Sequence, residues 1–160
     1  MKDEKNTSKL NNKTYWKEWY KKYHPHPMFV HFPIALHFFA AGLDILFFIF
    51  PKSSFASAVF YSFLAAIVTG FFAMIPGIFS WWVNYKMSWT RIFIVKLVLS
   101  VLNVLLGIVA INIYLQNPQV VFDLSLESII YHSIVLITMV FVAIVGHYGA
   151  KLTWSKKNPK

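Results

Sequence analysis

The sequence predicts an all-α membrane protein: a bundle of four transmembrane helices in up-down-up-down order, preceded by a short interfacial amphipathic helix. The first observation is composition, because 58% of the 160 residues are hydrophobic and only 13% are charged, whereas a soluble domain averages about 25% charged residues. The second is the presence of four apolar windows that are long enough to cross a bilayer. Together they exclude an ordinary soluble enzyme and a disordered chain.

Each predicted span contains about 20 mostly apolar residues, the length that a membrane-spanning helix needs. The four spans are 28–50, 57–80, 92–115 and 129–150. All are apolar around most of their circumference, which is typical of spans rather than of surface helices. The residues that end or interrupt them are Pro51 and Lys52, then Pro76-Gly77, then Asn117-Pro118, and finally Lys151.

The chain divides into a basic cytoplasmic or interfacial segment (1–27), a transmembrane domain (28–150) and a basic cytoplasmic tail (151–160). The first segment lacks the apolar stretch of a signal peptide. Aromatic residues recur in it at helical spacing with lysines between them, which predicts a short helix lying on an anionic leaflet; a solvated basic arm is the alternative. The aromatic residues are Tyr15, Trp16, Trp19, Tyr20 and Tyr23.

The net charge of +9 indicates topology rather than a nucleic-acid partner. An even number of spans puts both termini on one side of the membrane. Every basic residue except Lys52 and Lys96 belongs to that side, because the two opposite loops contain only Lys52. The positive-inside rule therefore predicts that both termini are cytoplasmic.

The absence of cysteine excludes disulfides, covalent haem attachment, iron–sulfur clusters and thiolate metal sites. Phosphate-binding loops, nucleophile elbows and paired carboxylates are also missing, so no catalytic residues are assigned. Metal chemistry would depend mainly on the six histidines, which lie in or beside the first and fourth spans: His24, His26, His31, His37, His132 and His147.

Depth along the spans determines which histidines can meet. From a helical rise of about 1.5 Å per residue, His147 lies close to the cytoplasmic face, at a level that His31 or His37 can share, whereas His132 lies near the far face. A b-type haem needs two imidazoles from facing helices at matching depth. We therefore expect His147 with His31 or His37 as axial ligands of one haem, in preference to two haems.

Other residues could complete this haem site. Arg91 and Lys96 could meet the propionates, although Lys96 could equally extend its amine to the headgroups. Gly146 and Gly149 would let a macrocycle or a neighbouring backbone approach closely.

On the far side, His132 and Asp44 have nearly the same depth, which predicts a hydrogen bond between them. A proton-relay or metal role for the pair is the alternative.

The stretch from His24 to His31 allows a second kind of site. His24, His26 and His31 could bind copper, nickel or zinc, provided that the chain folds back to bring in His31. Pro25 and Pro27 should keep this stretch extended. The alternative is a structural entry to the first span, in which proline sets the turn.

Several motifs resemble a family of bacterial four-helix membrane proteins, the domain-of-unknown-function family numbered 2231. The motifs are His26-Pro-Met-Phe-Val-His-Phe-Pro-Ile-Ala-Leu, Gly42-Leu-Asp44, Ala73-Met-Ile-Pro76-Gly77-Ile-Phe-Ser-Trp81 and Gly146-His147-Tyr-Gly149-Ala-Lys-Leu. The resemblance extends over most of the chain after residue 24. It implies a location in the bacterial inner (cytoplasmic) membrane.

Members of the family are similar to b-type cytochromes, so the resemblance implies haem-based electron transfer. It puts weight on His26, His31, His132 and His147 as haem or metal ligands and leaves His37 as a feature of this sequence alone. The chain departs from the pattern at Ala150, where a glycine is expected, and at Lys96, where a histidine is expected.

The resulting expectation is a membrane-embedded b-type cytochrome, or the cytochrome subunit of an oxidoreductase complex, that transfers electrons between quinone and a redox partner. The partners would be the lipid bilayer, quinone, and a partner subunit or a second copy of the chain. Two alternatives stay open: a non-redox membrane anchor or assembly subunit, and a metal or proton transporter that uses the histidine-rich first span.

Overall fold

A computed structural model describes residue 18 and residues 25–157 of the chain, with side chains described at 18 and over 29–151. Over this part the protein is entirely helical. Its elements are α2 (Pro25–Ile49), α3 (Ser53–Tyr85), α4 (Arg91–Gln116), the short 3₁₀ helix η1 (Pro118–Phe122) and α5 (Leu126–Lys157).

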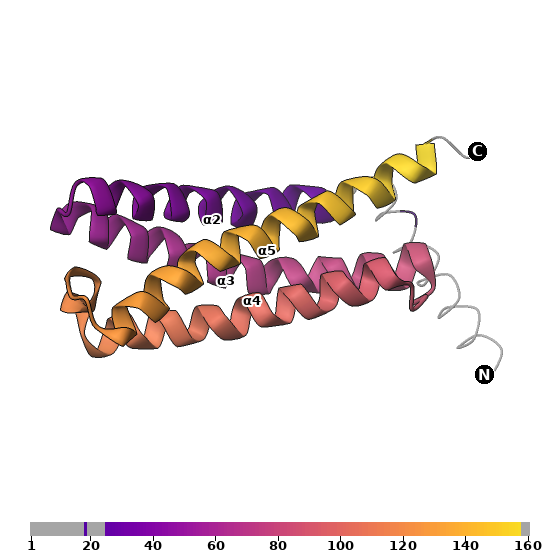
Figure 1. Ribbon diagram of the computed structural model, residues 1–160. Helices are drawn as coiled ribbons and strands as arrows, with labels where there is room; N and C mark the ends of the chain where they lie inside the picture. The colour runs from indigo at the N-terminus through magenta and orange to yellow at the C-terminus, as the bar shows by residue number, and fades with distance from the viewer. Residues whose placement is uncertain (1–17, 19–24, 158–160) are drawn as a thin grey trace, which may run out of the picture.

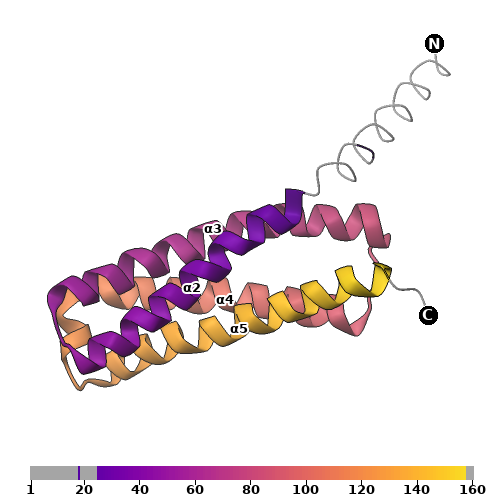
Figure 2. The same ribbon diagram turned by 90° about the horizontal axis from the view of Figure 1, so that it is seen from above.

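The four long helices run up and down alternately, as Figure 1 shows. One end of the bundle, called here the terminal end, holds the start of α2, the α3–α4 turn and the end of α5. The opposite end, called the η1 end, holds η1 and the short loop between α2 and α3 (Figure 2). Neighbours in sequence pack together, and α5 also packs against α2, so the helices form a closed ring.

All four long helices are long and apolar enough to cross a membrane. Large apolar side chains cover the outside of the bundle, including Phe39, Phe71 and Leu105, each more than half exposed. Patches of this extent are rare on soluble proteins, whereas a bilayer solvates them. The predicted fold class, an all-α bundle of four spans, is confirmed. The predicted interfacial helix and most of the segment 1–27 lie outside the described residues.

The first helix corrects one expectation, because residues 25–27 are helical rather than extended. Pro25 and Pro27 occupy its first turn, where the missing amide hydrogen has no intrahelical acceptor to satisfy. Pro33 lies further inside the same helix. The second and fourth helices are also longer than the predicted spans 57–80 and 129–150, because helical structure continues beyond the apolar windows on which the prediction was based.

Most of the buried apolar core lies in the half of the bundle that contains η1. Its members include Phe47, Phe63, Val121, Tyr131 and Val135, which come from α2, α3, η1 and α5. In the terminal half, Trp81 is buried and its indole Nε1–H donates to the carbonyl of Ser88 at 3.0 Å, across the α3–α4 turn. Among the described side chains, more are therefore buried around η1 than at the terminal end.

Candidate functional site

Asp44 of α2 and His132 of α5 form a hydrogen-bonded pair inside the η1 half of the bundle. The imidazole Nδ1 donates to carboxylate Oδ1 at 2.7 Å. Asp44 is fully buried and His132 is 6% exposed. The predicted hydrogen bond between these two residues is confirmed.

Aromatic rings fix the orientation of this imidazole. Phe47 stacks on it at 5.8 Å between ring centroids, and Phe48 lies against it at 4.8 Å. Tyr131 packs edge-on at 5.3 Å. Within the described part of the chain, carboxylate Oδ2 of Asp44 and the hydroxyl of Tyr131 are buried without a hydrogen-bond partner. The pair is thus held in a largely apolar environment that leaves two polar atoms unsatisfied, an unusual and costly arrangement.

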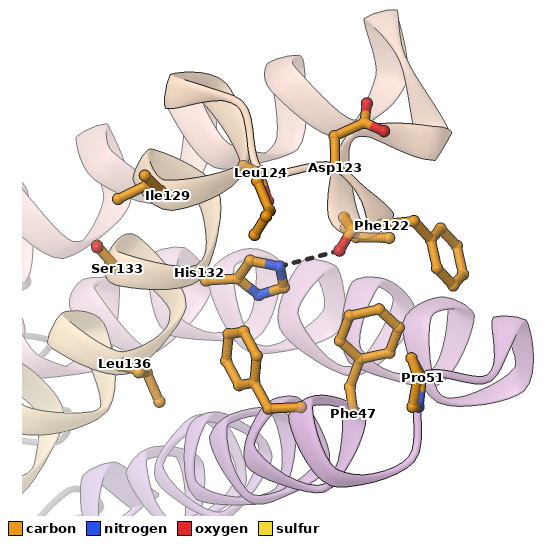
Figure 3. A pocket seen from close by; sticks show the side chains of 12 residues that line it. Phe47, Pro51, Phe122, Asp123, Leu124, Ile129, His132, Ser133 and Leu136 are labelled. Atoms are coloured by element: carbon orange, nitrogen blue, oxygen red, sulfur yellow. Dashed lines mark hydrogen bonds between the residues drawn. The ribbon is translucent and has the colours of Figure 1, made fainter.

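His132 also forms part of the wall of a pocket of about 370 Å³ between α2, η1 and α5. Figure 3 shows the ring of His132 above the phenyl group of Phe47, with its second nitrogen toward η1. That nitrogen, Nε2, lies 3.4 Å from the carbonyl oxygen of Val121, a long contact. The remaining lining residues are Phe47, Phe48, Pro51, Phe122, Asp123, Leu124, Ser128, Ile129, Ser133 and Leu136.

His37 is engaged in a separate buried hydrogen-bond network. Its Nδ1–H donates to the carbonyl of Pro33 at 2.8 Å, and its Nε2 accepts from the amide Nδ2 of Asn103 at 3.1 Å. Since Asn103 belongs to α4, this contact crosses the diagonal of the bundle. Both ring nitrogens are therefore occupied, and His37 would have to break a hydrogen bond to ligate a metal.

His31 and His147, in contrast, are exposed on the outside of the bundle. His147 lines a shallow groove of about 520 Å³ along the seam between α2 and α5. Phe38 is the α2 residue in that groove, and it shares a helix face with His31, because two turns separate them and their directions differ by about 20°. The other lining residues are Met139, Val140, Ala143, Ile144 and Tyr148.

The two exposed histidines also lie at nearly the same level of the bundle. Ile34 marks the register of α2 against α5, because a Cβ added at Gly146 would stand 3.4 Å from its Cδ1. Counting from this contact in opposite directions along the two helices puts His31 within about 3 Å of the level of His147. The structure thus brings these two histidines to one seam and one level.

The two cationic residues predicted to meet the haem propionates both lie on α4. Arg91 is exposed at the start of α4. The amine of Lys96 lies against Gly149, 3.7 Å from where a Cβ would stand. Gly149 and His147 point about 200° apart around α5, so Lys96 and the groove lie on different faces of that helix.

The candidate copper or zinc site is only partly described. His24 lies outside the described residues, and so does the side chain of His26. In the described part of the chain, no group of three or more histidine and carboxylate residues could hold a metal ion.

Sequence reasoning missed Asn103, Tyr131 and the contribution of η1. A lone amide in the middle of an apolar span is the signal that could have identified Asn103, since such groups usually bond to another helix. The position of Val121 beside His132 could not have been predicted in this way, because the sequence of residues 118–122 indicates only a loop that begins at Pro118.

A family model described as Predicted membrane protein (DUF2231) matches residues 24–158. The match includes all four long helices and every histidine. No curated protein and no solved structure matches the chain.

Proposed function

This chain belongs to the DUF2231 family of predicted membrane proteins, and we propose that it is a membrane-embedded b-type cytochrome, or the cytochrome subunit of an oxidoreductase complex. One observation carries the proposal: His31 and His147 are both exposed, and the register of α2 against α5 at Ile34 and Gly146 puts them within about 3 Å of the same level. Two imidazoles from facing helices at matching depth are the donor set of a six-coordinate b-type haem.

The residues around the seam fit such a group. The groove beside His147 is lined by aromatic and aliphatic side chains, with Phe38 on one side and Met139 and Ile144 on the other. Apolar walls suit a macrocycle, and their low polarity tunes the potential of the iron. His31 is exposed, whereas His37 is buried and its nitrogens bond to Pro33 and Asn103, so His31 is the second ligand that we propose.

In this function the protein binds and orients the cofactor, and when bound the haem supplies reversible one-electron transfer. His31 and His147 would hold the iron between α2 and α5, and Phe38 would limit access of other molecules to the groove. The proposed electron exchange is between quinone in the bilayer and a redox partner, which is a partner subunit or a second copy of the chain. We assign the termini to the cytoplasmic side of the bacterial inner membrane, because Lys86, Arg91 and Lys151 lie at the terminal end, whereas the loops of the η1 end contain only Lys52.

Absorbance of the purified protein tests this function. The chain is expressed with haem precursor supplied and isolated in a mild detergent without metal-stripping agents. The expected result is a Soret band and a sharp α band after reduction. Replacement of either proposed ligand, by His31→Ala or His147→Ala, should remove most of the bound haem, whereas His132→Ala at the opposite end should retain it.

Three outcomes would count against the proposal. A colourless preparation without metal would leave the anchor or assembly alternative. A colourless preparation with stoichiometric copper or zinc would favour the transporter alternative. Loss of haem in His132→Ala together with retention in His147→Ala would place the cofactor at the wrong end of the bundle.

A further inference from the structure

We propose that the pocket beside His132 at the η1 end binds the headgroup of a quinone or quinol, with His132 as the hydrogen-bonding residue and Asp44 as the residue that positions it. The inference rests on the proposed function for the class of ligand, since that function needs a quinone partner. The site itself is argued independently of any haem, from the pocket, the hydrogen bonds and the depth of the pair in the membrane.

The pocket can be reached from the bilayer. Two of its lining side chains, Phe48 and Ile129, are 60% and 58% exposed on the outer surface of spanning helices. His132 follows the start of α5 by about 9 Å along the helix, which corresponds to a shallow depth below the membrane surface. A ligand dissolved in lipid can therefore enter sideways, and the depth suits a ring with polar oxygens attached to an apolar tail.

Size and lining agree with a single aromatic headgroup. The volume of about 370 Å³ is within the range of about 300–1,000 Å³ that small-molecule sites occupy. The walls include three phenyl groups, from Phe47, Phe48 and Phe122, which can stack on a flat ring. Such sites usually combine apolar walls with a few convergent polar groups, and His132 is the buried polar side chain that this pocket presents beside Ser128.

The hydrogen bond to Asp44 determines what His132 offers to a ligand. With Asp44 as a carboxylate, Nδ1 carries the hydrogen that it donates to Oδ1. In the neutral imidazole Nε2 is then an acceptor, so the long contact of 3.4 Å with the carbonyl of Val121 can be a hydrogen bond only when the ring is protonated. A quinol hydroxyl can donate to this Nε2, and the protonated ring can instead donate to a quinone carbonyl.

Charge around the pocket argues against other ligands. Lipid headgroups that carry phosphate need basic partners, whereas the charged residue in the lining is Asp123. A metal cation needs more donors than the Asp44–His132 pair supplies, and the described residues contain no group of three such donors. A neutral headgroup with oxygen donors and acceptors needs neither basic partners nor a cluster of three metal-binding side chains.

Fluorescence quenching by a short-tailed ubiquinone analogue tests the proposal on the full chain in detergent micelles. A reporter is introduced by Phe48→Trp in the pocket, and the control is Phe72→Trp on α3, where the parent side chain is 57% exposed outside the pocket. The native tryptophans contribute equally to both variants. Quenching at position 48 should saturate with quinone concentration, and quenching at position 72 should rise linearly without saturation.

Two second-site changes in the Phe48→Trp background then identify the contacts. Ser133→Phe fills the pocket without removing either member of the Asp44–His132 pair and should abolish saturation. His132→Gln should weaken binding at least tenfold, and circular dichroism with thermal unfolding verifies that both variants are folded. Linear quenching at position 48, or unchanged saturation in Ser133→Phe, would overturn the quinone site.

The absorbance of the same samples separates the two proposals. Haem bands with linear quenching at position 48 would overturn the quinone site and leave the cytochrome intact. Saturable quenching in a protein that never binds haem would support the quinone site and overturn the cytochrome assignment.

Discussion

The hydrogen bond between Asp44 and His132 joins α2 to α5 across 88 positions of sequence, with 2.7 Å between carboxylate and imidazole. It connects the first and last spans of the ring, so it helps to close the bundle at the η1 end. A second polar contact between long helices joins His37 of α2 to Asn103 of α4. Both pairs lie in interiors where an unmatched polar group is costly.

Removal of one member of the first pair should be strongly destabilising. Asp44→Ala leaves a buried imidazole, and His132→Ala leaves a buried carboxylate, at a cost of about 3–5 kcal/mol for each change. The double variant Asp44→Ala with His132→Ala removes both polar groups and should lose clearly less stability than the sum of the two single changes. Reversible unfolding in mixed micelles gives the three free energies. Additive losses would show that the two residues are not energetically coupled.

Asn103→Ala should destabilise the bundle by about 1–3 kcal/mol, because Nε2 of His37 loses its donor in a buried position. The same helix provides a matched control in Asn112, which is exposed and donates to the carbonyl of Ile108 within its own helix. Asn112→Ala should change the free energy of unfolding by less than about 0.5 kcal/mol. Equal effects of the two substitutions would contradict the assigned diagonal contact.

The contact between α3 and α4 depends on the absence of a side chain at Gly107. A Cβ there would overlap the side chain of Ile67, which is itself buried. Gly107→Ala should therefore destabilise by about 1–3 kcal/mol, and Ile67→Val should relieve part of that cost.

Gly42→Ala is the control for this prediction, because nothing lies within 4 Å of the position that its Cβ would take. This substitution should be neutral or stabilising, since alanine favours a helix. A destabilising effect at Gly42 as large as that at Gly107 would mean that the close α3–α4 approach is not the cause.

Single cysteines can test the orientation in the membrane, because the chain has none of its own. Ser54 lies at the η1 end and Ser88 lies in the α3–α4 turn, and both are exposed. In intact cells with a permeable outer membrane, an impermeant maleimide should label Ser54→Cys and leave Ser88→Cys unlabelled until the inner membrane is opened. The reverse pattern would place the termini outside the cytoplasm.

Depth could be predicted from the sequence, whereas helix rotation could not. Asp44 and His132 were expected to meet because counting residues from the span ends fixes their levels, and the hydrogen bond confirms that reasoning. The same count did not decide whether His31 or His37 is the partner of His147. The spans are apolar on every side, so no amphipathic pattern shows that His37 faces Asn103 in the interior while His147 faces outward.

Helix ends were predicted less well, again for a physical reason. Lys52 and Thr90 precede α3 and α4, and neither side chain caps the helix that it precedes. Helix ends then had to be predicted mainly from hydropathy. Hydropathy gives the length of the apolar window, not the residues at which the helix begins and ends. The extension of α3 as far as Tyr85 therefore went unpredicted, as did the 3₁₀ turn that carries Val121.

The concentration of buried side chains around η1 implies that local stability varies along the bundle axis. Opening a segment near Phe63 and Tyr131 would expose core surface from several helices at once, whereas opening the first turns of α4, which hold no fully buried side chain, would expose less. Amide hydrogens in the η1 half should consequently exchange slowly and as one cooperative unit. In the terminal half, where His31 and His147 lie and fewer described side chains are buried, amide hydrogens should exchange faster, as we expect of an end that accepts an inserted group.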